Sequence, residues 1–384
     1  MRCKLSDICS FRKGKVEVES LNAKNYISTE NMLPNKCGIT EASSLPTVSL
    51  TQEYKNGDVL VSNIRPYFKK IWQAQYDGGC SNDVLVFVPN SNTDKDFLYY
   101  VLADDDFFTY SMATSKGTKM PRGDKTSIMQ YEVPLIDLQV QEKIASVLKA
   151  LDKKIELNKK INNNLEQQIK ALYNKFFVDT QNSEWNEVPF SKLIFFQEGP
   201  GIRNWQYVDE GVKFINIRCI NNGNINTTTA NKISKEEAYG KYNHFLLEPY
   251  DIVMSCSGTL GRYAIVQEEH LPLCLNTSVI RFRPAQNKFD YSFVYGYMTS
   301  SEFLNQQIMM ANGSAQVNFG PTHLKQIVIK EPPIEIRKQF NEIVFPILNN
   351  MICNRSENSK LALLRDTLLP KLMSGELDVS DIDL

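Results

Sequence analysis

The sequence has little of what a metal-binding, redox or secreted protein needs. Its 384 residues include only three histidines, and its eight cysteines form no C-x-x-C pair. No histidine stands at ligand spacing from a cysteine, so we expect no zinc site and interpret the cysteines as buried free thiols. No apolar run approaches the ~18 residues of a membrane span, and no apolar segment marks a secretion signal. We therefore expect a cytoplasmic protein.

The motifs of common nucleotide and cofactor enzymes are also missing. There is no G-x-x-x-x-G-K-[ST] phosphate loop, and no glycine-rich turn accompanied by the Asn/Asp-Pro-Pro-aromatic or Pro-Cys strip of a DNA methyltransferase. Ser257 to Arg262 contains two glycines but lacks the rest of a dinucleotide-binding fingerprint. A tight turn that orients the Arg262 side chain explains the glycines better. The histidines have no Ser or Cys partner at a known motif spacing. A nuclease with paired carboxylates stays open, although no such strip stands out.

The charge of the chain is almost balanced, with a formal net charge of −1. A DNA-binding protein normally has a basic excess or at least a basic face, so the overall charge does not favour nucleic acid. The distribution is uneven, however, because Lys116 to Lys125 holds four bases and one acid. A local basic loop on a neutral protein is therefore possible.

A long helical pattern runs from Pro134 to Val178 without an internal glycine or proline. Its stripe advances by alternating steps of four and three, which is typical of a helix packed along another helix, and consists of Ile144, Leu148, Leu151, Ile155, Asn158, Asn162, Leu165, Ile169, Leu172 and Phe176. A helix lying on its own domain would show a similar stripe. A length of roughly 60 Å exceeds the width of a small domain, however, so we expect a partner helix.

The expected partner lies between Ile334 and Leu372. Its predicted stripe consists of Ile343, Ile347, Asn350, Asn354, Glu357, Leu361, Leu364 and Leu368. Both runs have apolar ends and a polar middle, and both begin alike, because Pro134 to Gln141 aligns with Pro332 to Gln339. The chain therefore contains a long internal repeat, which has to be recognised before the fold is predicted.

The segments that precede the two helical runs repeat as well. Short β-branched or aromatic segments bounded by turn residues predict strands at 58–61, 70–74, 83–88 and 127–133, with a helix over 97–112. In the second copy, 251–254 and 276–282 match strands and 292–310 matches the helix. Asn312 to Asn318 stands where Lys116 to Arg122 stood. We therefore predict two repeated units of the α/β (α+β) class at 1–133 and 185–331, alternating with long helical regions at 134–184 and 332–384.

Several weak motifs in a specific order give the chain a resemblance to a known family. They are Asp58 to Phe68 with Gly78 to Val84, Gly117 to Arg122, Leu151 to Asn158, Gly258 to Arg262, Gly313 to Asn318 and Leu368 to Glu376. In this order, with two domains alternating with two helices, the chain resembles the specificity subunit of type I restriction–modification systems, the HsdS family. Val317 departs from the pattern, since the family often has proline there.

The resemblance implies a non-catalytic subunit that reads double-stranded DNA. The two α/β units would be recognition domains in pseudo-two-fold repeat, each reading one half of a split site. The two long helices would form an antiparallel coiled coil that sets the spacing and docks two methyltransferase subunits. The chain itself would bind no cofactor, because S-adenosylmethionine and ATP would belong to the methyltransferase subunits and to the restriction or translocase subunits.

The residues that we predict to contact DNA lie in the two equivalent loops, in a basic-aromatic patch from Asn63 to Lys70, and at the further candidates Arg203, Asn204 and Arg262. Lysine and arginine can neutralise phosphates, whereas amides suit adenine edges. In the first domain they are Asn63, Arg65, Lys69, Lys70, Lys116, Gly117, Thr118, Lys119, Arg122 and Lys125; in the second they are Arg203, Asn204, Arg262, Gly313, Ser314, Gln316 and Asn318. The alternative is a solvated polar loop for the two equivalent loops and a simple surface strand pair for the patch from Asn63 to Lys70.

Two other kinds of protein compete with this interpretation. One is a self-standing DNA-modifying or DNA-cleaving enzyme with fused recognition domains, which the missing cofactor motifs disfavour. The other is a coiled-coil scaffold with no role on DNA, which the basic loop at Lys116 to Lys125 makes less attractive.

Overall fold

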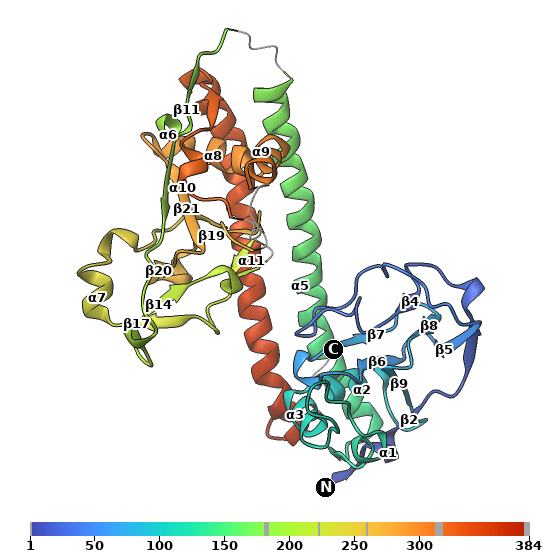
Figure 1. Cartoon of the computed structure of the whole chain (residues 1–384). Helices are drawn as coiled ribbons and strands as arrows, with labels where there is room; N and C mark the ends of the chain where they lie inside the picture. The colour runs from blue at the N-terminus through green and yellow to red at the C-terminus, as the bar shows by residue number, and fades with distance from the viewer. Residues whose placement is uncertain (1, 180–183, 222, 259, 312–317, 380–384) are drawn as a thin grey trace. The chain divides into compact units, whose positions relative to one another are not determined.

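The structure of the chain, a computed structural model, describes residues 2–179, 184–221, 223–258, 260–311 and 318–379. The chain divides into two compact units, one formed by Met1–Ile155 with Lys360–Leu384 and the other by Glu156–Ser359. Each unit contains one α/β recognition domain and one section of both long helices (Figure 1). The repeat predicted from the sequence is thus confirmed, as are the α/β class of the domains and the two long helices.

The recognition domain of the first unit has three layers. Its central antiparallel sheet has the strand order β2 (Cys9–Phe11), β9 (Val84–Pro89), β6 (Val59–Ser62), β7 (Ile71–Gln73). Helices α2 (Lys95–Ala103) and α3 (Asp105–Ala113) cover one face. The other face meets a second sheet, with the order β3 (Lys15–Glu17), β5 (Leu50–Tyr54), β8 (Gly78–Cys80), β4 (Tyr26–Ile27).

The central strands are apolar throughout because both faces of the sheet are buried. Val59 and Val61 point into the core beneath the helices, whereas Leu60, between them, joins the core beneath the second sheet. Leu85 and Val86 divide in the same way. Alternate residues of a strand point to opposite faces, so a strand buried on both sides is a continuous apolar run.

The second unit repeats the helix-covered sheet. Its strand order is β12 (Ile194–Glu198), β21 (Val279–Pro284), β18 (Ile252–Ser255), β19 (Tyr263–Ile265), with α8 (Tyr291–Met298) and α9 (Ser301–Ala311) beside it. The second sheet differs, because its order is β13 (Tyr207–Val208), β17 (Asn231–Ile233), β14 (Val212–Ile215), β20 (Leu273–Leu275). The strand that precedes the central strand β9 or β21 is therefore internal in the first unit, as β8, and at the edge in the second, as β20.

Short elements complete both domains. A two-stranded ribbon closes each one, β1 (Arg2–Lys4) with β10 (Glu132–Pro134) and β11 (Glu187–Pro189) with β22 (Val328–Lys330). The remaining short α-helices are α1 (Leu5–Ile8), α4 (Lys125–Ile128), α6 (Phe190–Leu193), α7 (Lys235–Tyr239) and α10 (Pro321–Leu324), and β15 (Ile220–Asn221) pairs with β16 (Asn224–Ile225) as a hairpin.

Three local predictions need correction. The helix predicted over 97–112 is two helices, because Asp104 adopts an extended conformation and caps α3 by accepting a hydrogen bond from the Asp106 amide. The helix predicted over 292–310 is likewise interrupted between α8 and α9, where Ser300 accepts a hydrogen bond from the Phe303 amide. The strand predicted over 127–133 is mostly helix α4 and turn, with only its end in β10.

Helices α5 (Leu138–Tyr173) and α11 (Ile334–Ser374) run antiparallel within each unit. In the first unit the Arg365 guanidinium donates to Asp152, at 2.6 Å. In the second unit the Tyr173 ring lies 6.2 Å from that of Phe340, while Asn354 donates to Asn162 at 2.9 Å. Residue numbers rise along one helix as they fall along the other, so the predicted antiparallel pairing is confirmed.

The predicted burial of the stripe is more accurate for α5 than for α11. Six of its members are buried, namely Ile144, Leu148, Ile155, Asn158, Asn162 and Ile169. In α11 the prediction is wrong for Ile343, Asn350 and Leu364, which are exposed. The buried side chains are instead Arg337, Phe340, Val344, Leu348, Met351, Arg355, Leu369, Leu372 and Met373. The prediction considered only a helix partner, whereas Phe340 and Val344 also share a core with the recognition domain.

No helix in the described part of the chain combines the length and the apolar character needed to cross a membrane. All eight cysteines are free thiols, and five of them are buried. Cys37 and Cys353 are exposed, so the predicted burial does not hold for these two.

The polar middle of the helix pair provides a stability test. Asn162 is buried, donates to the Met351 carbonyl at 3.1 Å and accepts from Asn354 at 2.9 Å. Replacing Asn162 by Ala leaves these partners unpaired inside the seam, so we expect the free energy of unfolding to fall by about 1–3 kcal/mol in denaturant titrations. The neighbouring Asn163→Ala, on an exposed position, is the control. Equal stability of the two variants would contradict this role for the polar middle.

Candidate nucleic-acid interface

The two basic segments predicted in the first domain meet at one edge of the central sheet. Strand β6 ends at this edge and β9 begins there, with Ser62 opposite Val84. The chain after β6 then pairs with the loop before α4, because Arg65 donates its amide to the Pro121 carbonyl at 2.8 Å and Gly123 donates to Asn63 at 3.1 Å. We name residues 62–70, 81–84 and 116–123 the first loop edge.

The basic loop of the first loop edge is closed at its base. Lys116 and Arg122 exchange two backbone hydrogen bonds, of 2.9 and 3.0 Å, and Gly117 supports the turn with a φ of 91°. The Lys116 ammonium donates to Asp124 at 2.6 Å, and this hydrogen bond, with those from Ser127, lowers the pKa of Asp124 to about 2. The tip, residues 117–120, is exposed.

The basic side chains of the first loop edge divide into two groups. Lys69 pairs with Asp105 at 2.7 Å, and Lys70 donates to the Thr29 carbonyl and lies over the Phe68 ring. Burial lowers the pKa of Lys70. These two side chains hold loops together, so the structure gives them a scaffolding role, and their contact with DNA stays a prediction.

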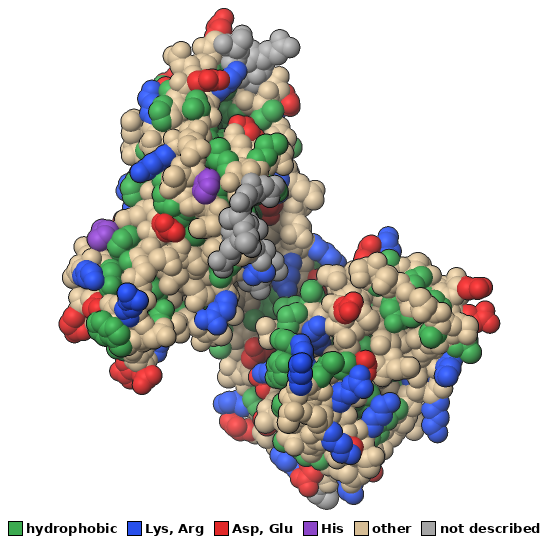
Figure 2. All heavy atoms as spheres, in the orientation of Figure 1, with side chains coloured by type: hydrophobic (Ala, Val, Ile, Leu, Met, Phe, Trp, Pro, Cys, Tyr) green, Lys and Arg blue, Asp and Glu red, His purple; other side chains and the backbone are tan. Residues whose placement is uncertain are grey.

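The other basic side chains of this region are exposed. They are Arg65, Lys119, Arg122 and Lys125, of which Arg122 forms an ion pair with Asp83 at 3.1 Å and Lys125 lies over the Phe11 ring. Exposed ion pairs are weak and exchange readily for other partners. On the face drawn in Figure 2, Lys and Arg side chains are distributed over the first unit with hydrophobic side chains among them.

The second unit builds the same edge with other side chains. Asn318 forms an antiparallel bridge with Ser257, as Arg122 does with Ile64, and Phe319 donates to the Cys256 carbonyl at 2.8 Å. The amides of Asn63 and Cys256 donate to the equivalent carbonyls of Asp83 and Ser278, at 2.8 and 3.1 Å. We name residues 255–258, 260–262, 276–279 and 318–319 the second loop edge. Gly313, Ser314 and Gln316 lie outside the described residues.

Arg262 and Arg203 lie on different parts of the second domain. Arg262 is exposed at the end of the turn after β18, where its backbone exchanges hydrogen bonds with Ser255. Arg203 and Asn204 belong to the connection between β12 and β13, which leaves the sheet beside Thr277. The structure therefore places Arg262, but not Arg203 and Asn204, directly in the second loop edge.

Two exposed apolar side chains were missed from the sequence. Trp205 is 78% exposed on a turn fixed by Gln206, whose buried side chain donates to Glu237 at 2.7 Å. Met120 is exposed at the tip of the basic loop. The signal was present in both cases, because an aromatic directly follows Arg203-Asn204 and an apolar residue interrupts a basic run.

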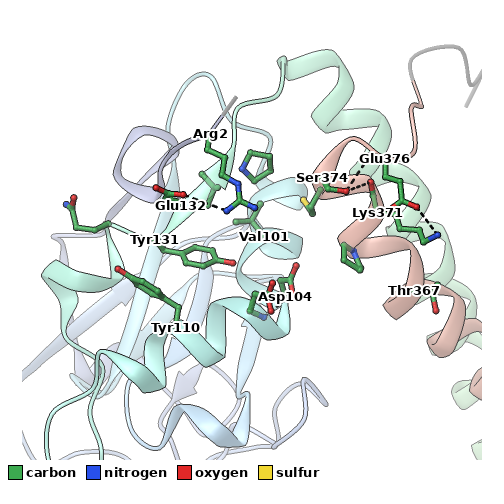
Figure 3. Close-up of a pocket in the computed structure, with 16 residues that line it drawn as sticks. Arg2, Val101, Asp104, Tyr110, Tyr131, Glu132, Thr367, Lys371, Ser374 and Glu376 are labelled. Atoms are coloured by element: carbon green, nitrogen blue, oxygen red, sulfur yellow. Dashed lines mark hydrogen bonds and ion pairs between the residues drawn. The ribbon is translucent and has the colours of Figure 1, made fainter.

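A cavity of about 1110 Å³ in the first unit is a separate feature (Figure 3). It lies between the β1–β10 ribbon, helices α2 and α3, and the end of α11. Its charged lining consists of Arg2, Asp104, Asp106, Glu132, Lys371 and Glu376, of which Arg2 pairs with Glu132 and Lys371 with Glu376. The excess of carboxylates does not suit a phosphate backbone, so this cavity is not the DNA site.

Within the described residues, no group of three or more His, Cys, Asp or Glu side chains could hold a metal ion. The chemistry available at both loop edges is hydrogen bonding and charge. Such groups can bind an anionic polymer and distinguish base edges.

Comparison with known proteins identifies the family. The family described as type I restriction modification DNA specificity domain matches residues 1–167 and 182–363. The chain belongs to this family. Its two matches correspond to the two copies of the internal repeat.

Individual relatives agree with this assignment. The HindI specificity subunit of Haemophilus influenzae is 24% identical, over 92% of this chain and 94% of that protein. The MjaVIII specificity subunit of Methanocaldococcus jannaschii is also 24% identical, over 77% of this chain and 73% of that protein. The crystal structure of a type I restriction–modification S subunit from M. genitalium shares the fold, with a TM-score of 0.58, 17% identity and coverage of 97% and 96% of the two chains.

Family membership supports a non-catalytic DNA specificity subunit over the self-standing enzyme considered from the sequence. The individual DNA-contacting residues remain predictions. Of these, Arg122 and Asn318 hold equivalent places in the two loop edges.

Asn318 gives the sharpest test of a base contact. Its side chain is exposed beside Ser257, and an amide can form two hydrogen bonds with adenine. We expect Asn318→Ala to relax the preference for one base pair by about 1–3 kcal/mol, measured by methylation of a random-sequence duplex library in the assembled complex. Asn186→Ala, exposed beside the β11–β22 ribbon, is the control. An unchanged base preference at every position would exclude Asn318 as a base reader.

Proposed function

We propose that the chain is the DNA-reading subunit of a type I restriction–modification complex and that each recognition domain reads one half of a two-part site. The observation that carries this proposal is the double occurrence of one backbone frame with different side chains. Arg122 and Asn318 hold equivalent places, as do Asn63 and Cys256. A shared frame suits the common shape of duplex DNA, whereas different side chains suit two different base sequences.

The long helices fit the role of spacer and dock. A helix is stiff, so two readers carried on one pair of helices would contact half-sites at a fixed separation. Both helices also expose large apolar side chains, namely Leu157, Ile161, Leu363 and Leu364. Exposed apolar side chains of this size are commonly covered by a partner protein. We assign them to contacts with methyltransferase subunits.

The chemistry of the complex belongs to its other subunits in this proposal. The two methyltransferase subunits bring S-adenosylmethionine, and restriction or translocase subunits use ATP. The chain contributes the choice of DNA sequence and binds neither cofactor. It acts on double-stranded DNA in the cytoplasm without a membrane partner.

A first test separates recognition from catalysis. We expect the purified chain to transfer no methyl group from S-adenosylmethionine to DNA, and to support sequence-specific transfer once the methyltransferase subunit is added. Incorporation of labelled methyl groups into plasmid DNA measures both reactions. Transfer by the chain alone, at a rate that the added subunit does not change, would contradict the proposal.

A second test concerns the independence of the two domains. Replacing residues 185–331 by the equivalent domain of another specificity subunit should change one half of the recognised site and leave the other half intact, because the loop edges belong to separate compact units. Methylation mapping on random-sequence DNA shows both halves at once. Exchange of 1–133 is the matched experiment and should alter the opposite half. Changes in both halves after either exchange would show that the units do not read independently.

A further inference from the structure

Strained backbone is concentrated at one place in the first unit. Five non-glycine residues of the described chain have a positive φ: Asn35 at 56°, Lys36 at 60°, Arg65 at 50°, Lys69 at 49° and Tyr250 at 70°. The first four belong to two loops that touch. Left-handed backbone is unfavourable for residues with a Cβ, and such residues collect where function requires a particular geometry.

These two loops fix the turn between Arg65 and Lys69 from several sides. Asn35 donates its amide to the Phe68 carbonyl at 2.8 Å, and Lys36 donates to that of Lys69 at 2.9 Å. Lys36 and Lys69 both pair with Asp105, at 2.8 and 2.7 Å. The amide of Arg65 is held by Pro121. The turn is therefore rigid, and its scaffolding contacts do not use the Arg65 side chain.

The internal repeat shows what this fold needs at position 65. The equivalent residue of the second unit is Gly258, with a φ of 70°. Glycine adopts this conformation without strain, so stability alone would favour glycine at position 65 as well. Within the described residues, no hydrogen bond, ion pair or ring contact involves the exposed Arg65 side chain. Because Arg65 keeps a strained backbone and its side chain has no described partner within the chain, we infer that the side chain binds a partner outside the chain.

The second unit places its exposed arginine at the other end of the same turn. Arg262 is equivalent to Lys70, because the equivalent amides of Ser255 and Ser62 donate to their carbonyls at 2.8 and 3.0 Å, and Lys70 donates its ammonium to the Thr29 carbonyl in the first unit. The Arg262 side chain is exposed and has no partner among the described residues. Each turn thus presents one unpaired arginine, Arg65 in the first loop edge and Arg262 in the second.

We propose that Arg65 and Arg262 are positioning residues that each hold one DNA phosphate and set the register of their domain on the duplex. They project from the turn that follows the central strand β6 or β18, whereas Arg122 and Asn318 lie on the loops that bridge to this turn. Contacts to phosphate position a protein, and contacts to base edges specify the sequence. This inference rests on the proposed function, because it takes duplex DNA as the ligand of both edges.

The decisive variant is Arg65→Gly, which removes the side chain and the strain together. We expect the melting temperature of the full-length chain to rise, on the order of 2 °C. Binding of the assembled complex to its site should weaken roughly tenfold, equally for all base sequences. The slope of log affinity against log salt concentration should become shallower by about one. Fluorescence anisotropy with a labelled duplex, at several salt concentrations, measures both.

Three further variants complete the experiment. Asn35→Gly relieves the same kind of backbone on the supporting loop, so it should not lower the melting temperature and should leave DNA affinity unchanged. Arg65→Lys keeps the charge and should keep the salt slope. Arg262→Ala should weaken binding and lower the slope as Arg65→Gly does, with the base preference of the second half-site intact.

Each contrary result has a distinct meaning. A lower melting temperature of Arg65→Gly shows that the arginine is structural, and a relaxed preference at one base pair shows that it reads a base; either overturns the inference. Unchanged affinity and salt slope overturn it as well. If the unmodified complex discriminates no DNA sequence, the proposed function itself fails. If the unmodified complex is specific while Arg65→Gly binds as tightly, only the assignment of Arg65 fails.

Discussion

Both recognition domains depend on a short backbone pairing between the end of a central strand and a distant loop. Ile64 bridges Arg122, and Ser257 bridges Asn318. Because these hydrogen bonds join main-chain groups, they place the loops without restricting which side chains the loops carry. The position of each loop is therefore independent of the side chains that the loop carries. An arginine that can reach phosphate or guanine in one unit is replaced by an amide in the other, with the frame unchanged.

In the helix pair, apolar side chains supply stability, whereas polar side chains fix the register of one helix against the other. An apolar seam alone would allow neighbouring registers, because one leucine can replace another. The buried amides of Asn158 and Asn162 find partners only in one alignment, where Asn158 donates to Glu357 at 2.7 Å and Asn162 meets Met351 and Asn354. Buried polar groups of this kind fix register in coiled coils while contributing less stability than apolar residues. A spacer needs one fixed register, because a slip of one helix along the other would change the separation of the two recognition domains.

The sequence was informative wherever one local pattern determined the structure. Alternating steps of four and three predicted α5. The alignment of Lys116 to Arg122 with Asn312 to Asn318 predicted two equivalent loops, which the matching bridges bear out for Arg122 and Asn318, while residues 312–317 lie outside the described residues. The burial of α11 was less predictable, because Ile343 and Phe340 are equally apolar and only the packed domain decides between them. The left-handed conformation of Arg65 could not be foreseen, since the contacts that hold it come from loops remote in sequence.

The differences between the two units follow the layers of the domain. The sheet that packs against α2 and α3 or α8 and α9 shares its core with side chains of α5 and α11, such as Leu148 with Leu369 and Ile169 with Phe340. This layer has the same strand order in both units. The second sheet has cores of its own and a different strand order. Among the residues that the structure describes, the strands of the second sheet contribute none to the cores that contain side chains of α5 and α11, although the adjoining β15–β16 hairpin meets α11, where Asn224 donates to Ser359 at 3.3 Å. Rearranging this sheet therefore leaves the apolar contacts of the helix pair undisturbed, so it is here that two domains of one protein can diverge.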